Sequence, residues 1–310
     1  MSQAKEIKKR IKSISSTKKI TKAMEMVAAA KMRRAVEAVI KTRAYAKIGW
    51  GVAINIAEAV GSDKLIHPLL EKKTKTEKVV IVLIASNRGL CGGFNTAVVN
   101  KAVQSIKTHN DLPTDFILVG KRGDLVRRRF AYPVIAEFPK NDLKPSAVEV
   151  SPIAKIIIDD YLAGKYDKVL IAYTDFINPS QQVPRVRQLL PIELEGTDKY
   201  LAGAEGGRVQ ETEADRLKRR AKKNHSFIYE PNDSEVLDYL LPRLIELQLY
   251  QGLLESNAAE HSARMSAMSQ ASRAAEDIID ELTRFYNKAR QALITAEIAE
   301  ISSGASSVQN

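Results

Sequence analysis

The loop Ser86–Asn95 has the composition and the position that best suit phosphate chemistry. Its sequence, SNRGLCGGFN, follows an apolar run, Val79–Ala85, and precedes a stretch with helical composition. Dinucleotide and phosphate loops also lie between a strand and a helix. This loop, however, is neither GxGxxG nor GxxxxGKS, and it has no lysine for a phosphate group. We therefore expect its glycines to form a tight strand-to-helix turn rather than a nucleotide site.

The single cysteine and the four histidines do not form a catalytic or metal-binding pattern. Cys91 has no histidine nearby in the sequence, so we expect a small buried or half-buried residue rather than a nucleophile. The histidines, at positions 67, 109, 225 and 261, lack metal-ligand spacing. No acidic pair has a recognisable catalytic context. The sequence therefore predicts a chain that is not an enzyme and has no cofactor. A single cysteine also excludes an internal disulfide and fits a reducing compartment.

The first fifty residues predict one long basic helix. They contain no proline, and their 14 lysines and arginines stand against 3 acids, a net charge of +11. Between Ala23 and Ala30 the side chains are small or flexible nearly all round. Such a helix needs a partner, because propensity alone stabilises an isolated helix poorly. Apolar residues recur at steps of three, four or six, as on one helix face: Ile7, Ile11, Ile14, Ile20, Met24 and Val27.

The middle of the chain, residues 75–230, predicts an α/β domain. Short apolar strands alternate with helices, which is typical of a Rossmann-like layer with a mostly parallel sheet. The expected strands are 79–85, 116–120, 134–138 and 168–174, with an extended segment at 183–194. The expected helices are 94–108, 124–130 and 151–163, the last with Pro152 in its first turn. Residues 195–223, glycine-containing and basic, are expected to form a loop or insertion.

A second long helix is predicted within residues 231–310, capped by Asp233 or Ser234 and continuing to about Ser303. From Ser234 onward, 6 basic residues stand against 11 acids, a net charge of −5. This charge complements that of the first helix, so we expect an antiparallel coiled coil of residues 1–60 and 231–310. Its stripe of small and apolar residues has the steps of three and four of a coiled-coil seam: Leu237, Leu240, Leu241, Leu244, Leu247, Met265, Met268, Ala271, Ala275, Ile278, Ile279, Leu282, Tyr286 and Ala289.

The net charge and the lengths of the apolar runs indicate which partners and which membrane or targeting segments to expect. The chain's net charge of +11 indicates an acidic partner. The longest apolar run, Val79–Ala85, is far shorter than the roughly 18 residues of a membrane span, so we expect no direct span. The charged N-terminus lacks the pattern of a signal peptide, and it continues without the change of a cleavage site. We therefore expect neither a secretion signal nor a mitochondrial leader.

Four blocks of the sequence, in order along the chain, form a recognisable set. They are Ala4–Ile7 with Ile20–Ala29 (ITKAMEMVAA), Arg88–Asn95 (RGLCGGFN), Glu260–Met268 (EHSARMSAM), and Tyr286–Thr295 (YNKARQALIT) with Glu297, Glu300 and Gly304-Ala305. Together they resemble the gamma subunit of the rotary F-type ATP synthase. Asn87 departs from the aspartate that the family often has. The resemblance implies a non-catalytic central shaft. It would transmit torque between proton flow through the membrane rotor ring and conformational changes of the catalytic beta subunits.

The resemblance also implies partners and contact residues. The partners are the alpha and beta subunits of the catalytic ring, the epsilon subunit and the ring of c subunits, with one copy of this chain per complex. Met24, with Lys22 beside it, is implied to lie near the acidic lever segment of beta, although the pattern alone favours coiled-coil packing for Met24. The other implied contacts are two basic residues that meet acidic surfaces and three residues near the catch loops of beta. These are Arg33, Arg34, Arg290, Gln291 and Thr295.

Two other functions remain open from the residues alone. A nucleic-acid-binding coiled coil would use the basic helix and would bind DNA with steep salt dependence. No leucine zipper continues from the basic run, however, and the acidic C-terminal helix would compete for it. A dinucleotide enzyme built on Val79–Gly93 would bind its cofactor as an isolated chain. The preferred interpretation places the protein peripherally on the cytoplasmic side of a bacterial inner membrane, without nucleic acid.

Overall fold

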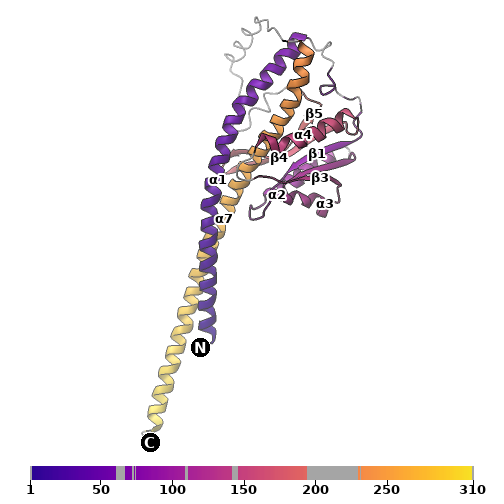
Figure 1. The fold of residues 1–310 in the computed structure, drawn as a ribbon. Helices are drawn as coiled ribbons and strands as arrows, with labels where there is room; N and C mark the ends of the chain where they lie inside the picture. Colours follow the sequence, from indigo (N-terminus) through magenta and orange to yellow (C-terminus); the bar gives the residue numbers. More distant parts are fainter. Residues whose placement is uncertain are drawn as a thin grey trace. The chain divides into compact units, whose positions relative to one another are not determined.

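The computed structural model describes residues 2–60, 67–71, 73, 75–108, 111–141, 146–193, 230 and 232–308. The predicted fold class is confirmed, since two long terminal helices flank an α/β sheet that is mostly parallel (Figure 1). The predicted insertion at 195–223 lies outside the described residues. The elements are α1 (Ser2–Val60), β1 (Val79–Ile84), α2 (Phe94–Thr108), β2 (Thr114–Val119), η1 (Lys121–Asp124), α3 (Leu125–Phe130), β3 (Val134–Phe138), α4 (Ala147–Leu162), β4 (Lys168–Asn178), β5 (Gln181–Leu190) and α7 (Asp233–Val308).

The chain divides into two compact units, and both long helices pass through both of them. The first unit, called here the helix unit, comprises residues 1–29 and 264–310. The second, the sheet unit, comprises residues 30–263. None of the helices in the described part of the chain has an apolar stretch long enough to cross a membrane.

A five-stranded sheet in the order β3-β2-β1-β4-β5 organises the sheet unit. β1 pairs in parallel with β2 and with β4, and β2 pairs in parallel with β3, whereas β5 is antiparallel to β4. All six residues of β1, VVIVLI, are buried, as expected of a central strand covered on both faces. β5 lies at the edge of the sheet, where Pro184 is tolerated because no further strand needs its missing N–H.

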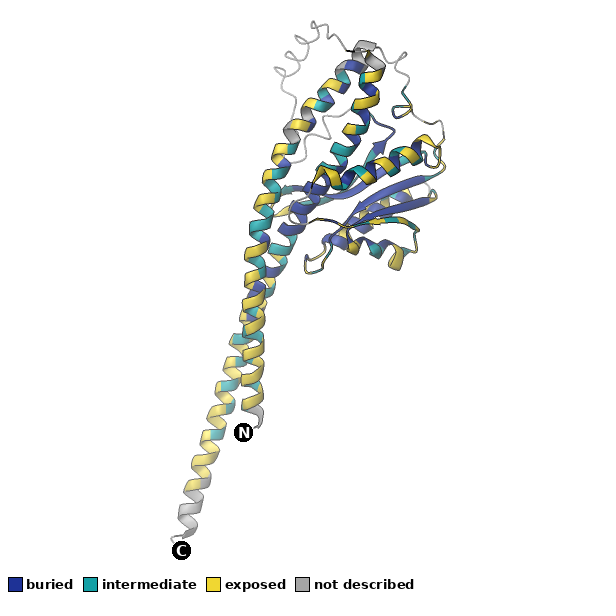
Figure 2. Cartoon of the chain, in the orientation of Figure 1, coloured by how far each residue is buried: buried dark blue, intermediate teal, exposed yellow. Residues whose placement is uncertain are grey.

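Alternate side chains of the strands build two cores, one on each face of the sheet. Ile81 and Leu83 point to the face that α2 covers. Val80 and Val82 point to the opposite face, which is covered by α4 and by the stretches of α1 and α7 that belong to the sheet unit. Figure 1 shows α2 and α4 on opposite faces, and Figure 2 shows the buried strands between them.

In the helix unit, α1 and α7 run antiparallel and meet along a coiled-coil seam. Lys18 Nζ lies 2.9 Å from Glu276 Oε1, which sets the register of the pair. The seam residues are buried or half-buried and recur in steps of three and four, as in a coiled coil. They are Ala4, Ile7, Ile11, Ile14, Lys18, Thr21, Glu25 and Ala28 on α1, and Met268, Ser272, Ala275, Ile279, Leu282, Tyr286 and Ala289 on α7.

Two residues of the predicted α1 stripe do not share the face of the others. Ile20 and Val27 are 61% and 56% exposed, whereas their neighbours Thr21 and Ala28 are buried in the seam. The step of six from Ile14 to Ile20 leaves the face that Ile7, Ile11 and Ile14 define, and the step of seven from Ile20 to Val27 stays off that face. At this level α1 therefore meets α7 through the smaller side chains of Thr21 and Ala28.

Two helix starts also differ from the prediction. α4 begins at Ala147 because Ser146 and Glu149 form a capping box, so Pro152 lies well inside the helix rather than in its first turn. At the start of α7, Asn232 Oδ1 accepts a hydrogen bond of 2.9 Å from the backbone N–H of Glu235. Asn232, rather than Asp233 or Ser234, therefore acts as the cap.

A substitution at Gly120, which follows β2, tests the backbone geometry of the sheet unit. Its φ is +97°, and a Cβ atom there would lie 2.4 Å from the carbonyl oxygen of Ala85. We predict that Gly120→Ala lowers the free energy of unfolding by at least about 2 kcal/mol, because positive φ and a backbone clash act together. Urea denaturation of the full chain measures this loss.

Gly164 provides the matched control. Its φ is also positive, +74°, but no heavy atom lies within 4 Å of the position of an added Cβ. Gly164→Ala should cost about 1 kcal/mol, the effect of backbone strain alone. Equal losses for the two variants would contradict the close approach of Gly120 to Ala85.

Candidate functional site

The loop after β1 uses its polar groups to hold its own shape. The backbone N–H of Ser86 donates to Asn95 Oδ1 at 2.9 Å, and Ser86 Oγ donates to Arg88 O at 2.7 Å. Cys91 is buried, as predicted, and its Sγ accepts a hydrogen bond from Asn95 Nδ2 at 3.3 Å. Leu90 and Gly92 have φ values of 63° and 57°, which produce a sharp reversal of the chain. The predicted tight strand-to-helix turn is therefore confirmed.

The titratable side chains do not converge on a metal centre in the described part of the chain. Among the residues that the structure describes, no group of three or more His, Cys, Asp or Glu side chains could hold an ion. His67 instead belongs to a local polar contact, in which its Nδ1 accepts from the Leu69 N–H and its Nε2 lies 3.1 Å from Asp238 Oδ1. Burial lowers the pKa of His67, and the neighbouring Asp238 only partly offsets this effect.

A polar stretch of α7, Glu255–Ser262 (ESNAAEHS), is buried at every residue. Glutamate, asparagine and serine are usually exposed on helices. Once buried, their polar groups need hydrogen-bond partners. Loops of the α/β layer supply several of these partners within the sheet unit. We call the contact between this stretch and those loops the helix–sheet joint.

An ion pair between Lys140 and Glu260 lies inside the helix–sheet joint. The side chains are 0% and 1% exposed, and Lys140 Nζ donates to Glu260 Oε2. One helical turn earlier, Asn257 Nδ2 donates to Asn141 O at 3.3 Å. The loop that carries Lys140 is held in turn by Asn87 Nδ2, which donates to Lys140 O at 2.6 Å. An aspartate at position 87 could not donate this bond when ionised.

The β4–β5 hairpin makes the other side of the helix–sheet joint. Ser262 Oγ donates to Pro179 O at 2.7 Å, and Gln182 Nε2 donates to Ser262 Oγ at 3.2 Å. Gly252 lets α7 lie directly on β4, since an added Cβ would be 2.8 Å from Ile171 Cδ1. Because hydrogen bonds are directional, these contacts fix the rotation of α7 about its own axis relative to the sheet.

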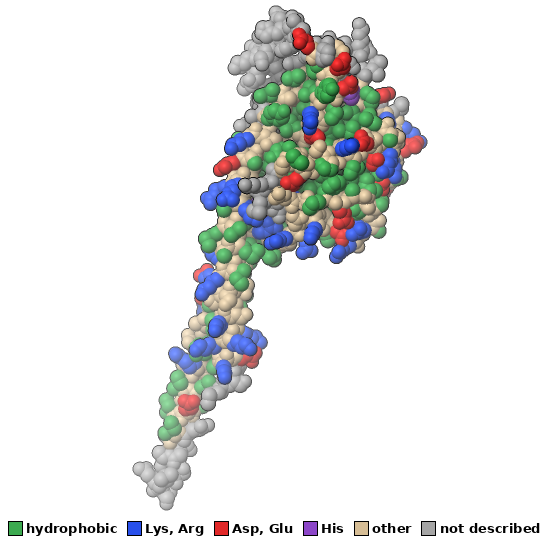
Figure 3. Space-filling view, in the orientation of Figure 1, with side chains coloured by type: hydrophobic (Ala, Val, Ile, Leu, Met, Phe, Trp, Pro, Cys, Tyr) green, Lys and Arg blue, Asp and Glu red, His purple; other side chains and the backbone are tan. Residues whose placement is uncertain are grey.

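The outward face of the helix unit is the second candidate surface. It carries large exposed apolar side chains. A contiguous apolar patch on a protein surface often marks a binding site for another protein. Figure 3 shows apolar and basic side chains along this unit. The exposed large apolar residues are Ile20, Met26 and Val27 on α1 and Ile278, Phe285, Ile294, Ile298 and Ile301 on α7.

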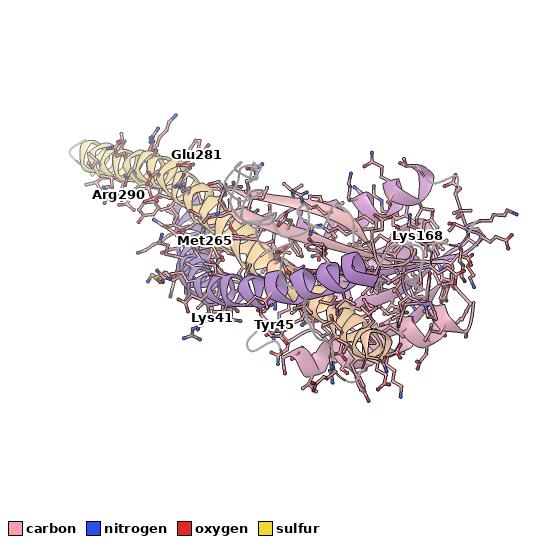
Figure 4. All side chains as sticks on the ribbon, turned by 90° about the horizontal axis from the view of Figure 1, so that it is seen from above. Lys41, Tyr45, Lys168, Met265, Glu281 and Arg290 are labelled. Atoms are coloured by element: carbon pink, nitrogen blue, oxygen red, sulfur yellow. The ribbon has the colours of Figure 1, made fainter. Side chains whose placement is uncertain are left out.

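Most of the predicted partner-binding residues are exposed on the helices. Lys22, Arg33, Arg34, Arg290, Gln291 and Thr295 are exposed, and Met24 is half-buried. Arg33 and Arg34 belong to the sheet unit and the other five to the helix unit. Gln291 and Thr295 share one face of α7, and Figure 4 shows Arg290 on the same helix. Lys22 Nζ lies 3.1 Å from Glu25 Oε2. The role of these residues in partner binding stays a prediction.

The helix–sheet joint was not predicted from the sequence. Glu260–Met268 was expected only as a block of resemblance, without a buried contact. The signal that could have found the joint is the run Glu255–Ser262, in which acids, an amide and hydroxyls surround two alanines. The partner Lys140 lies 120 positions away, so nothing in its local sequence marks it as buried.

This chain is similar to known proteins over nearly its whole length. A family model described as ATP synthase matches residues 3–308. The ATP synthase gamma chain of Pelotomaculum thermopropionicum is 40% identical over 309 residues, which cover 100% of each chain. The ATP synthase gamma chain of Symbiobacterium thermophilum is also 40% identical, over 308 residues and 98% of each chain.

Solved structures share the fold. A chain in the cryo-EM structure of the Euglena gracilis mitochondrial ATP synthase, OSCP/F1/c-ring, matches with a TM-score of 0.64 and 18% identity. That match covers 99% of this chain and 95% of the other. A chain in the Tetrahymena thermophila mitochondrial ATP synthase central stalk/c-ring matches with a TM-score of 0.60 and 24% identity. Here 82% of this chain and 99% of the other are covered.

The buried ion pair of the helix–sheet joint yields a double-mutant test. Lys140→Met or Glu260→Met alone should lower the free energy of unfolding by about 3–5 kcal/mol, because each leaves the other charge buried without its partner. The double variant should recover most of this loss, since a buried pair replaced by apolar residues is often nearly neutral. Chemical denaturation of the full chain measures all three variants.

The exposed pair Lys165–Asp160 serves as the control, with side chains 48% and 25% exposed. Lys165→Met should cost less than about 1 kcal/mol. If Lys140→Met cost no more than this control, the Lys140–Glu260 contact would not hold α7 to the sheet.

Proposed function

This chain belongs to the family of ATP synthase gamma chains, and we propose that it is the rotating shaft that transmits torque in that complex. In this role it breaks no bond itself. Rotation of the ring of c subunits turns the shaft, and the shaft drives the catalytic beta subunits of the surrounding alpha–beta ring through their conformational changes. ATP hydrolysis would turn the shaft in the opposite sense.

The observation that carries the proposal is that α1 has two different faces in the helix unit, one buried and one exposed. One face, with Thr21 and Ala28, is buried against α7, while Ile20, Met26 and Val27 face outward. A shaft that turns inside a ring must contact it at every angle without binding tightly at any one. Apolar and small side chains suit this need, because their contacts are weak one by one and non-directional.

The partner-binding residues enter the proposal in three groups. Lys22 and Met24 contact the acidic lever segment of beta, and Arg33 and Arg34 meet the same acidic surfaces, where charge complementarity guides the contact more than it strengthens it. The third part of the set, Arg290, Gln291 and Thr295, contacts the inner faces of the ring near the catch loops of beta. All but Met24 are exposed, which leaves them accessible to such partners.

The helix–sheet joint supports the transfer of torque inside the sheet unit. A twisting force on the α/β layer reaches α7 through Lys140–Glu260 and Ser262, whose directional bonds resist rotation of the helix. We propose that the α/β layer, within residues 75–230, contacts the epsilon subunit and the c ring, whereas residues 1–60 and 231–310 form the shaft.

The proposed location follows from the proposed partners. The chain would be held peripherally at the bacterial plasma membrane, on its cytoplasmic side, by the rotor ring. The bacterial relatives at 40% identity support membership of the complex, and the location rests on the assembly proposed here.

Assembly is the first test of the proposed function. Co-expressed with alpha and beta subunits of the same source, the full chain should purify in one particle with a single copy per alpha–beta ring. Native mass spectrometry measures this stoichiometry. Two copies per ring, or no complex at all, would remove the shaft proposal.

Met24→Lys tests the contact with the lever of beta. A lysine in place of Met24 adds a long charged side chain at a half-buried position next to Lys22, and we predict that it reduces proton-driven ATP synthesis several-fold while the complex still assembles. Synthesis is measured in proteoliposomes and normalised to the amount of intact complex. The control, Val148→Lys, changes a side chain of α4 that is 76% exposed, and it should leave synthesis unchanged. Normal synthesis in the Met24→Lys complex would show that position 24 does not face the lever.

A further inference from the structure

A cavity of about 350 Å³ opens at the amino-terminal edge of the sheet, between the strands and the last turns of α2. Val79, Thr114 and Lys168, which begin β1, β2 and β4, all line it. Ligand sites in proteins usually have volumes of roughly 300–1,000 Å³. The cavity lies within the sheet unit and contains none of the predicted partner-binding residues, so a ligand there does not depend on the proposed function.

The floor of the cavity is apolar because one face of the sheet points into it. Side chains alternate between the two faces along a strand, and in the register of β1 and β4 Val79 lies beside Lys168. Two residues further on, Ile81 lies beside Leu170, so all four side chains share the face that α2 covers. Ile106 of α2 closes the opposite side. An aliphatic group that enters is removed from water, which favours binding in proportion to the apolar area covered.

Lys168 is the only charged residue among the described residues that line the cavity, and it is half-buried on β4 (Figure 4). The nearby acids are paired with other lysines. Asp167 Oδ1 lies 2.9 Å from Lys73 Nζ, and Asp115 Oδ2 lies 3.0 Å from Lys78 Nζ. In the part of the chain that the structure describes, no ion pair engages Lys168. An unpaired ammonium group beside an apolar floor favours a ligand with an anionic group at one end.

The rim of the cavity includes the carboxyl end of α2, which disfavours an anion. Two features reduce this effect. The Ile106 carbonyl already accepts a hydrogen bond of 3.2 Å from the Asp111 N–H. The hydroxyl of Thr76, which also lines the cavity, makes no hydrogen bond within the described part of the chain and can donate to an anionic group. Lys168 and Thr76 together therefore provide donors for a carboxylate.

We propose that this cavity binds a medium-chain fatty acid. The alkyl chain lies on Val79, Ile81 and Leu170, and the carboxylate accepts hydrogen bonds from Lys168 and Thr76. A wholly apolar molecule would cover the ammonium group without pairing it, and a wholly polar one would leave the apolar floor in contact with water. No aromatic side chain is among the described lining residues, so an alkyl chain suits the floor better than a ring that needs a stacking partner.

Isothermal titration calorimetry of the full chain with hexanoate, octanoate and decanoate tests the site, with each acid kept below the concentration at which it forms micelles. We expect one molecule to bind per chain. The Kd should fall about three- to fourfold for each added methylene, because each methylene removes more apolar area from water. No saturable binding, or a Kd that does not depend on chain length, would overturn the proposal.

Lys168→Met tests the carboxylate contact, because methionine has a similar length but no charge. Octanoate should bind about tenfold more weakly to this variant, through the loss of a charge-assisted hydrogen bond, whereas binding of uncharged 1-octanol should change far less. Lys165→Met is the matched control, since Lys165 is 48% exposed and does not line the cavity. An octanoate affinity that Lys168→Met leaves unchanged, or that Lys165→Met lowers equally, would overturn the proposal.

Methyl NMR of the wild-type chain locates the ligand without any variant. The methyl signals of Ile81 and Ile106, which line the cavity, should shift during titration with octanoate. Ile157, which is fully buried in the core on the opposite face of the sheet, is the control and should not shift. Shifts of Ile20 and Ile278, on the exposed face of the helix unit, without shifts of Ile81 and Ile106, would place the fatty acid on that face and overturn the proposal.

Discussion

The burial of a polar helical stretch is the constraint on which the sheet unit depends. Glu255–Ser262 is buried against a surface that supplies hydrogen-bond partners to the carboxylate of Glu260, the amide of Asn257 and the hydroxyl of Ser262. Lys140, the Asn141 carbonyl and the Pro179 carbonyl provide that surface. An apolar contact of the same area would hold α7 as firmly but would specify its rotation less, because apolar contacts have no preferred direction. The polar contact therefore suits a helix that must not slip.

The helix unit is organised by the opposite principle. Among its described residues, Thr21, Ala28, Met268, Ser272 and Ala275 are buried, so mostly small side chains form the buried contact there. Ile20 and Val27, which are larger, are exposed. Directional bonds thus fix α7 where it meets the α/β layer, whereas α1 and α7 carry exposed apolar side chains in the helix unit. Both properties suit a shaft that is driven at one part and slides at another.

The sequence predicted the parts of the fold that depend on local pattern. The apolar run 79–85, the helical spacing of both ends and the edge prolines led to the correct fold class, because burial on two faces and helical periodicity leave direct traces in composition. Side-chain orientation was harder to predict. Ile20 and Val27 were placed from their spacing on one helix face with Ile7, Ile11 and Ile14, whereas the face that meets α7 continues through Thr21 and Ala28. The Lys140–Glu260 pair could not be predicted because it joins residues far apart, and each of its charges looks solvated in its own segment.

Rotation of a single complex tests the central claim that this chain transmits torque. The alpha–beta ring is attached to a surface, and a probe is attached through Leu162, an exposed residue of α4 in the sheet unit. On addition of ATP, the account predicts that the probe turns continuously in one direction for as long as hydrolysis continues. A probe that stays still, or only fluctuates, while the same complex hydrolyses ATP at its normal rate would contradict the account.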